Sequence, residues 1–321
     1  MAIKIGCTVW TLLKPNFEPP YEDAIRKIGQ YGFDGIELLL RNKKDMESYW
    51  TLPKIKEMRT LLSEQKLELS QLCLFQNLMG GLASLDAVKK KESLENFETS
   101  CKIAGELDAG FISFVSPWPE DVTGRTTATL PEYFYLNVPD MVTPGMEDRC
   151  VEGWRFEAKF RIFFPEPFHW NEYWDNFIDS MKRVDEIAKR NGIKVTVENR
   201  NNTMTPHTDS MLRMFHAVGS DGLGANFNTA QAFLHREVLE WAAHKYGKKL
   251  FHIRAGDGDG LACYNLPVGD GIIDWKGLVY GLKEIEYDGF LSFEWLNDSE
   301  KEEHVKKSLA YMREILQEKD L

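Results

Sequence analysis

Short apolar runs that look like buried strands alternate with amphipathic helical segments along this chain. Eight such runs are rich in apolar or β-branched residues, as expected of parallel strands that are buried on both faces. They cover residues 3–10, 33–40, 67–75, 110–117, 193–200, 223–228, 250–256 and 290–295. Eight repeats of strand and helix predict an α/β fold, a closed (β/α)₈ barrel whose strands all end at one rim.

The segments between these runs have apolar residues at helical spacing. This spacing is clearest in residues 21–32, 52–65, 171–192 and 299–316. Glycines expected to cap helices are Gly32, Gly110, Gly192 and Gly289. An open doubly wound sheet is the alternative, but no G-x-G-x-x-G motif follows the first strand. We therefore expect residues 1–321 to form a single TIM-barrel domain.

One segment, residues 118–170, interrupts the alternation after the fourth strand. Its aromatic residues are Trp118, Tyr133, Phe134, Tyr135, Trp154, Phe156, Phe160, Phe163, Phe164, Phe168 and Trp170. A long loop that leaves the carboxyl end of a barrel strand lies on the catalytic face. We expect this insertion to be a lid, an aromatic substrate site or a subunit interface, the alternative being an excursion that buries its own aromatic residues.

The charge and cysteine content argue against several classes of function. A net charge of −11 disfavours a nucleic-acid partner. The five cysteines are scattered and form no C-x-x-C pair, which argues against a zinc cluster or a disulfide framework. No segment approaches the ~18 apolar residues that a membrane span requires. The opening residues, MAIKIGCTVW, do not resemble a signal peptide, so we expect a cytoplasmic protein.

Polar side chains lie at the ends of the last four expected strands. They are Glu198, Arg200, Asn226, Asn228, Gln231, His252, Arg254 and Glu294. Because the carboxyl ends of barrel strands meet at one rim, we expect these side chains to share one site. Two carboxylates, one amide and one imidazole suit Mn²⁺, Co²⁺ or Mg²⁺. Whether Asn226 or Asn228 faces the ion stays open, because a one-residue error in register exchanges the two faces of a strand.

The chain resembles the xylose-isomerase-like barrel superfamily of sugar isomerases and epimerases over nearly its whole length, apart from the insertion. The resemblance rests on GFDGIEL (32–38), VTVENR (195–200), NFNTAQA (226–232), FHIR (251–254), LPVGDGIIDW (266–275) and YDGFLSFEW (287–295). It implies a metal held by Glu198, Asn228, His252 and Glu294, with Mn²⁺ the expected ion. The family's usual D-T-x-H motif reads N-T-A-Q at 228–231. The amide of Asn228 therefore supplies less charge to a metal than an aspartate would. Gln231 stands in place of a histidine and cannot carry a proton as histidine can.

The chemistry implied by the resemblance is proton transfer on a sugar. The metal chelates a carbonyl and a neighbouring hydroxyl, and a carboxylate removes the α-proton to form an enediolate. Glu198 and Glu294 would act as base and acid on opposite sides of the substrate. The expected substrate contacts are Glu37, Arg200, Gln231 and Arg254.

The fate of the enediolate decides the function. Reprotonation gives a ketose 3-epimerase or a sugar isomerase, whereas expulsion of a β-substituent gives a lyase. The N-T-A-Q sequence, the H-I-R-A-G-D-G-D strand and the aromatic insertion resemble the branch with the catalytic α-subunits of C-glycoside deglycosidases. That branch implies a lyase that cleaves 3-oxo-glucosides of aromatic aglycones, in a hetero-oligomer with a small β-subunit. A non-catalytic sugar-binding barrel is a further alternative, which the amides at Asn228 and Gln231 favour.

Overall fold

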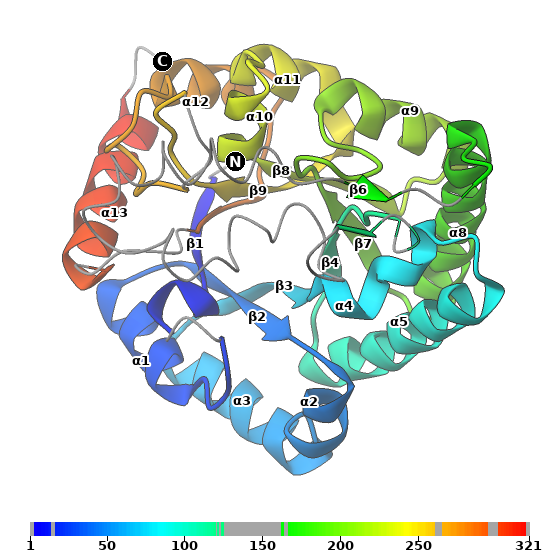
Figure 1. Cartoon of the computed structure of the whole chain (residues 1–321). Helices are drawn as coiled ribbons and strands as arrows, with labels where there is room; N and C mark the ends of the chain where they lie inside the picture. The colour runs from blue at the N-terminus through cyan, green and yellow to red at the C-terminus, as the bar shows by residue number, and fades with distance from the viewer. Residues whose placement is uncertain are drawn as a thin grey trace.

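The computed structural model describes residues 3–13, 17–119, 121, 123–124, 162–163, 166–260, 265–294 and 301–318. Within these ranges, eight parallel strands close into a barrel in the order β1-β10-β9-β8-β7-β4-β3-β2 (Figure 1). They are β1 (Lys4–Thr8), β2 (Gly35–Leu40), β3 (Glu68–Leu74), β4 (Phe111–Val115), β7 (Lys194–Glu198), β8 (Leu223–Asn228), β9 (Leu250–Ala255) and β10 (Phe290–Phe293). Each strand lies inside a run expected from the sequence, and the (β/α)₈ barrel is confirmed.

Helices surround the barrel in Figure 1. They are α1 (Glu22–Tyr31), α2 (Lys43–Ser48), α3 (Leu52–Glu64), α4 (Gln76–Met79), α5 (Ala87–Leu107), α8 (Trp170–Arg190), α9 (Thr208–Val218), α10 (Thr229–Leu234), α11 (Leu239–Tyr246), α12 (Trp275–Glu284) and α13 (Lys301–Gln317), with 3₁₀ turns η1 (Val9–Leu12), η2 (Gly80–Ala83) and η4 (Gly247–Lys249). Their apolar faces pack on the strands, which explains why the strands are apolar on both faces. Among the described helices, none has the length and apolar character needed to cross a membrane.

Two of the four expected glycine caps are present. Gly32 and Gly192 adopt positive φ angles of 83° and 68° at the ends of α1 and α8. The predictions for Gly110 and Gly289 are wrong, because in each turn a different residue, nearer to the end of the helix, has the left-handed conformation. These residues are Asp108, with φ of 63°, and Glu286, with φ of 57°.

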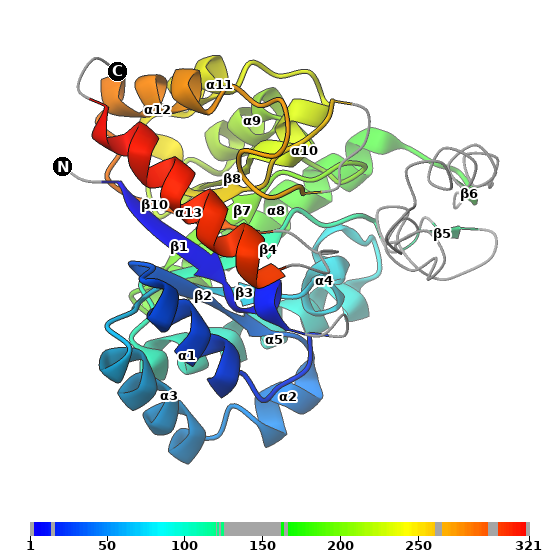
Figure 2. The ribbon, with the colours of Figure 1, turned by 90° about the vertical axis from the view of Figure 1, so that its left-hand side faces the viewer.

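The aromatic insertion expected at residues 118–170 lies mostly outside the described residues. Its two ends meet as an antiparallel pair of short strands, β5 (Thr123–Gly124) and β6 (Ile162–Phe163). Figure 2 shows this pair beyond the carboxyl ends of the barrel strands, which form the mouth of the barrel. The substrate and partner roles expected of the central aromatic residues concern positions outside the described ranges, and they stay predictions.

Candidate active site at the barrel mouth

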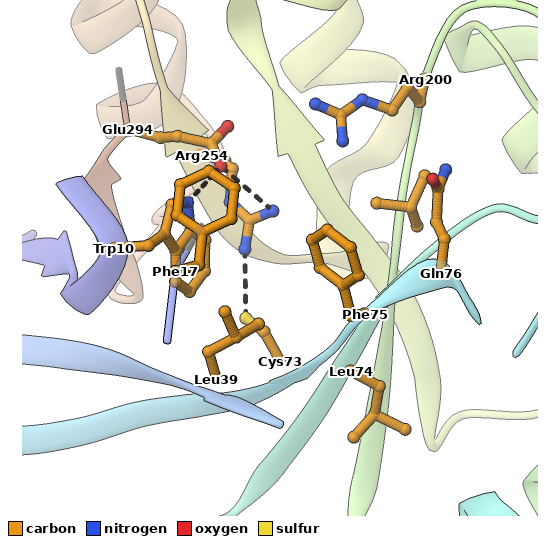
Figure 3. Close-up of a pocket in the computed structure, with 11 residues that line it drawn as sticks. Trp10, Phe17, Leu39, Cys73, Leu74, Phe75, Gln76, Arg200, Arg254 and Glu294 are labelled. Carbon is orange, nitrogen blue, oxygen red and sulfur yellow. Dashed lines mark hydrogen bonds and ion pairs between the residues drawn. The ribbon is translucent and has the colours of Figure 1, made fainter. Parts of the chain in front are cut away.

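A cavity of about 510 Å³, which includes space open to solvent, lies at the carboxyl ends of the strands (Figure 3). It is lined by Trp10, Phe17, Leu39, Cys73, Leu74, Phe75, Gln76, Val115, Arg200, Arg254 and Glu294. In Figure 3 Glu294, Arg254 and Arg200 lie in the upper half of the view, and Leu39 and Leu74 lie in the lower half. The cavity therefore offers a ligand both an apolar wall and charged groups.

Arg254, at the end of β9, is the centre of the charged cluster. Its guanidinium donates hydrogen bonds to Glu198 on β7 and to Glu37 on β2. Its Nη1 lies 3.9 Å from Oε1 of Glu294, and its Nη2 lies 3.1 Å from Sγ of Cys73. All of these side chains are buried. Because buried carboxylates need a compensating charge, Arg254 holds the three acidic side chains together.

Burial and charge act differently on the carboxyls of this cluster. Burial raises the pKa of Glu37, but the charge of Arg254 and several hydrogen bonds outweigh burial, and this pKa lies below its ordinary value. Burial, together with the charge of Glu198, holds the pKa of Glu294 above its ordinary value, although Arg254 and Arg200 oppose the shift. Glu294 therefore takes up a proton more readily than Glu37, and Glu294 lines the cavity.

Two side chains outside the predicted set fix the carboxylate of Glu294. Nε1 of Trp10 donates to Oε1 at 2.8 Å, and Nδ2 of Asn265 donates to Oε2 at 3.0 Å. The guanidinium carbon of Arg254 lies 5.0 Å from the centre of the Trp10 ring, within range of a cation–π contact. Trp10 follows β1 directly, so the rule of strand ends, applied to the first strand, would have found it.

The predicted metal ligand His252 lies one layer deeper in the barrel than Arg254. Its Nδ1 is 3.0 Å from Oδ1 of Asn226, and its Nε2 is 3.1 Å from Oγ of Ser292. Asn226 uses its Nδ2 to donate to Ser113, so its Oδ1 accepts the proton of Nδ1. Burial lowers the pKa of His252 to about 4, and the imidazole is neutral. The structure therefore does not bring His252 to the mouth.

The other predicted ligands are also engaged with one another. Nδ2 of Asn228 donates to Glu198 at 2.8 Å, and Oδ1 of Asn228 accepts from the backbone N–H of Gln231 at the start of α10. The guanidinium of Arg254 lies between Glu198 and Glu294. A metal site of this kind needs three acidic or histidine side chains whose ligand atoms lie close together. Among the described residues, such a group, with ligand atoms within 4.8 Å of one another, occurs only on α11 and α12, outside the barrel. In this arrangement the mouth does not fit a divalent metal.

The predicted substrate contacts divide into two groups. Arg200 and Arg254 line the cavity. Glu37 is fully buried beside Arg254, and Oε1 of Gln231 accepts from the backbone N–H of Asn201. Of the two asparagines between which the sequence did not decide, Asn228 lies beside Glu198, whereas Asn226 lies in the deeper layer with His252.

The buried, neutral His252 predicts a loss of stability in mild acid. In the unfolded chain His252 has its ordinary pKa of 6.5, whereas in the folded protein the pKa is about 4. Between these values the unfolded state binds more protons, so the free energy of unfolding falls as pH decreases from 6.5 toward 4. The full contribution is about 3 kcal/mol, at about 1.4 kcal/mol for each pKa unit.

Urea unfolding of the wild type and of His252→Gln at several pH values between 7 and 5 measures this effect. The pH dependence should be weaker in the variant. His235 also has a pKa below its ordinary value, because of burial, and it contributes equally to both proteins. An unchanged pH dependence in His252→Gln would contradict the assignment.

Two curated relatives share parts of this sequence. An uncharacterised protein of Methanocaldococcus jannaschii is 28% identical over 189 residues, which cover 53% of this chain and 64% of that protein. Inosose dehydratase of Geobacillus thermodenitrificans is 18% identical over 227 residues, which cover 64% of this chain and 75% of that protein. The chain thus spans less than two thirds of the length of the first relative.

Solved structures of two sugar epimerases have the same fold. D-psicose 3-epimerase from Clostridium cellulolyticum H10, with D-tagatose, has a TM-score of 0.74 at 16% identity, covering 98% of this chain and 99% of that chain. The 3-keto-D-glucoside 4-epimerase from E. coli has a TM-score of 0.70 at 17% identity, covering 97% and 99%. Residues 25–315, most of the sequence, match the model of the xylose isomerase-like TIM barrel family, and this chain belongs to that family.

Proposed function

We propose that this chain is an enzyme of the sugar isomerase and epimerase kind, in which Glu294 removes a proton from the carbon beside a sugar carbonyl. The proposal rests on one observation. Glu294 lines the mouth cavity together with two guanidinium groups, those of Arg200 and Arg254. A carboxylate base beside fixed positive charge is what enolisation of a carbonyl compound requires.

The proton transfer uses this chain's own side chains. The α C–H bond breaks as a new O–H bond forms on the Glu294 carboxylate, and the electron pair moves to the carbonyl oxygen. The guanidinium charge stabilises the enediolate that results. Delivery of a proton from solvent to the other face gives an epimer, and return of the proton from Glu294 to the neighbouring carbon gives an isomer. Glu198, which is buried against Arg254, positions that guanidinium in this proposal.

The names of the similar proteins support a sugar or sugar-like substrate. One acts on D-psicose, one on a 3-keto-D-glucoside and one on inosose. The first two are epimerases, and the third is a dehydratase. These names include both epimerases and a dehydratase, and the substrate of this chain is a proposal. No step uses a metal ion, and metal analysis of the purified protein decides the prediction of Mn²⁺.

Cleavage of a C-glycoside is the second candidate, and the apolar side of the cavity favours it. Trp10, Phe17 and Phe75 line the cavity, and the ring centres of the two phenylalanines are 6.4 Å apart. An aromatic aglycone would pack against these rings while the 3-oxo sugar meets Glu294. The enediolate would then expel the aglycone as a β-substituent, and the aromatic carbon that loses the sugar would take up a proton from solvent. The small β-subunit belongs to this candidate, and co-purification of a small co-encoded protein would support it.

Product analysis distinguishes the candidates. The protein is incubated in D₂O with 3-oxo-glucose, with ketoses and with a 3-oxo-C-glucoside of a flavonoid. A new epimer or isomer with deuterium at the α-carbon supports the first candidate, and free aglycone supports the second. Binding of these sugars with neither product would show that the proposed function is wrong and that a non-catalytic sugar-binding barrel is correct.

A further inference from the structure

Arg254 lies where a metal ion would need to lie to contact the carboxylates of the mouth. We infer that its guanidinium takes the place of a divalent metal in this barrel, so that the positive charge of the site belongs to a side chain. The catalytic half of this inference, stabilisation of the enediolate without a metal, rests on the proposed function. The binding half, exclusion of a divalent ion from the mouth, rests on the geometry alone.

The geometry leaves no position between Glu198 and Glu294 for an ion. A divalent ion binds carboxylate oxygens at about 2.0–2.6 Å, depending on the metal. Nη1 of Arg254 is in direct contact with Oε2 of Glu198 and lies 3.9 Å from Oε1 of Glu294. An ion that bridged the two carboxylates would overlap with this nitrogen and would be repelled by its charge.

Glu37 supplies a second observation that is independent of the metal question. This carboxylate lies on β2, across the barrel from Glu198 on β7, and is fully buried. It accepts hydrogen bonds from Arg254, from Gln71 at 2.9 Å and from Cys73 at 2.9 Å. Glu37 and Glu198 thus flank the guanidinium, and the barrel is built to keep a cationic side chain at its centre.

Arg254 also lines the cavity, so its guanidinium charge lies beside any ligand that enters the mouth. Its Nε is buried and has no hydrogen-bond partner within the described residues. A guanidinium offers several donors in one plane, which suits two neighbouring oxygens of a sugar or an enediolate. It differs from a divalent metal because its charge is single and because it is covalently part of the chain.

Metal content tests the binding half directly. Wild-type protein is incubated with Mn²⁺, desalted and analysed by atomic emission. We expect far less than one ion per chain and no change of melting temperature with EDTA. One retained Mn²⁺ per chain, whose removal lowers the melting temperature, would overturn the inference.

A substitution provides the complementary test. Arg254→His removes the cation and adds a nitrogen ligand beside Glu198 and Glu294, so we expect this variant to retain about one Mn²⁺ per chain. Arg200→His is the matched control, because it changes the other guanidinium that lines the cavity, and we expect no gain of Mn²⁺. Equal Mn²⁺ content in both variants would contradict the role of Arg254. If Arg254→His does not fold, as circular dichroism would show, the wild-type measurement decides alone.

Activity in EDTA separates this inference from the proposed function. Deuterium exchange into a 3-oxo sugar that persists in EDTA supports both. Exchange that is lost in EDTA and restored by Mn²⁺ overturns the inference and leaves the proposed function intact. If no sugar exchanges, the proposed function and the catalytic half of the inference are wrong, and the metal content still decides the binding half.

Discussion

Arg254→Met is expected to destabilise the folded protein by about 3–5 kcal/mol at neutral pH, the range found when one partner of a buried ion pair is removed. Methionine keeps most of the length of arginine but has no charge. The substitution therefore leaves Glu37, Glu198 and Glu294 close together, buried and without their shared cation. Their mutual repulsion and their desolvation would then oppose folding.

Urea unfolding at pH 7 and at pH 5 measures this effect and tests its cause. Without Arg254, burial raises the pKa of Glu37 above its ordinary value, so the folded variant binds protons more readily than the unfolded chain. A carboxyl whose pKa is higher in the folded state lowers the free energy of unfolding at pH values above that pKa. This loss becomes smaller as pH falls. The deficit of Arg254→Met should therefore shrink at pH 5, and Arg254→Met combined with Glu37→Gln should recover part of it at pH 7.

The control is Arg59→Met on α3, where the arginine side chain is 51% exposed. A surface substitution of this kind changes stability by about 0.5 kcal/mol or less. Similar unfolding midpoints for the two variants would contradict the view that Arg254 is the structural cation of the mouth.

The strands of the barrel could be predicted because each has a local signature. A parallel strand covered by helices on one side and by the barrel interior on the other is apolar on both faces, so it appears as a continuous apolar run. The convergence of Glu198, Arg254 and Glu294 could also be predicted, because strands of a closed barrel end at one rim. These inferences need only the order of the elements along the chain.

The depth of a side chain within the barrel could not be predicted in the same way. Residues two apart on a strand point to the same side, so His252 and Arg254 both face inward and the alternation does not say which one reaches the mouth. The structure places Arg254 there and leaves His252 in the layer below. The same ambiguity applied to Asn226 and Asn228 on β8.

The hydrogen-bond and ion-pair partners of the mouth residues also could not be predicted from the sequence. Trp10 and Glu294 are 284 positions apart, and Glu37 and Arg254 are 217 positions apart. Each pair joins elements from opposite ends of the chain that become neighbours only when the barrel closes. Periodicity reports which face of an element is buried, but it contains no information about which distant side chain a buried charge will meet.

Glu294→Gln is expected to lower the rate of proton exchange on a 3-oxo sugar by about 10³-fold, within the range found when a general base is removed. The amide has the same size and still accepts the hydrogen bond from Trp10, but it cannot take up the proton. Its NH₂ group would face Nδ2 of Asn265, and rotation of the Asn265 amide relieves this contact. The unfolding midpoint should therefore change little while the rate falls.

The pH profile shows whether the lost group is the base. Burial holds the pKa of Glu294 above its ordinary value of 4.5, and a base acts only when deprotonated, so the wild-type rate should rise with pH through a midpoint above 4.5. Glu198→Gln is the matched control. Because Glu198 contacts Arg254 and not the cavity, this variant should lose stability and part of its rate but keep a rising limb. The limb should move to lower pH, because the charge of Glu198 helps to raise the pKa of Glu294. Exchange at the wild-type rate in Glu294→Gln, or loss of the limb only in Glu198→Gln, would assign the base to a different side chain.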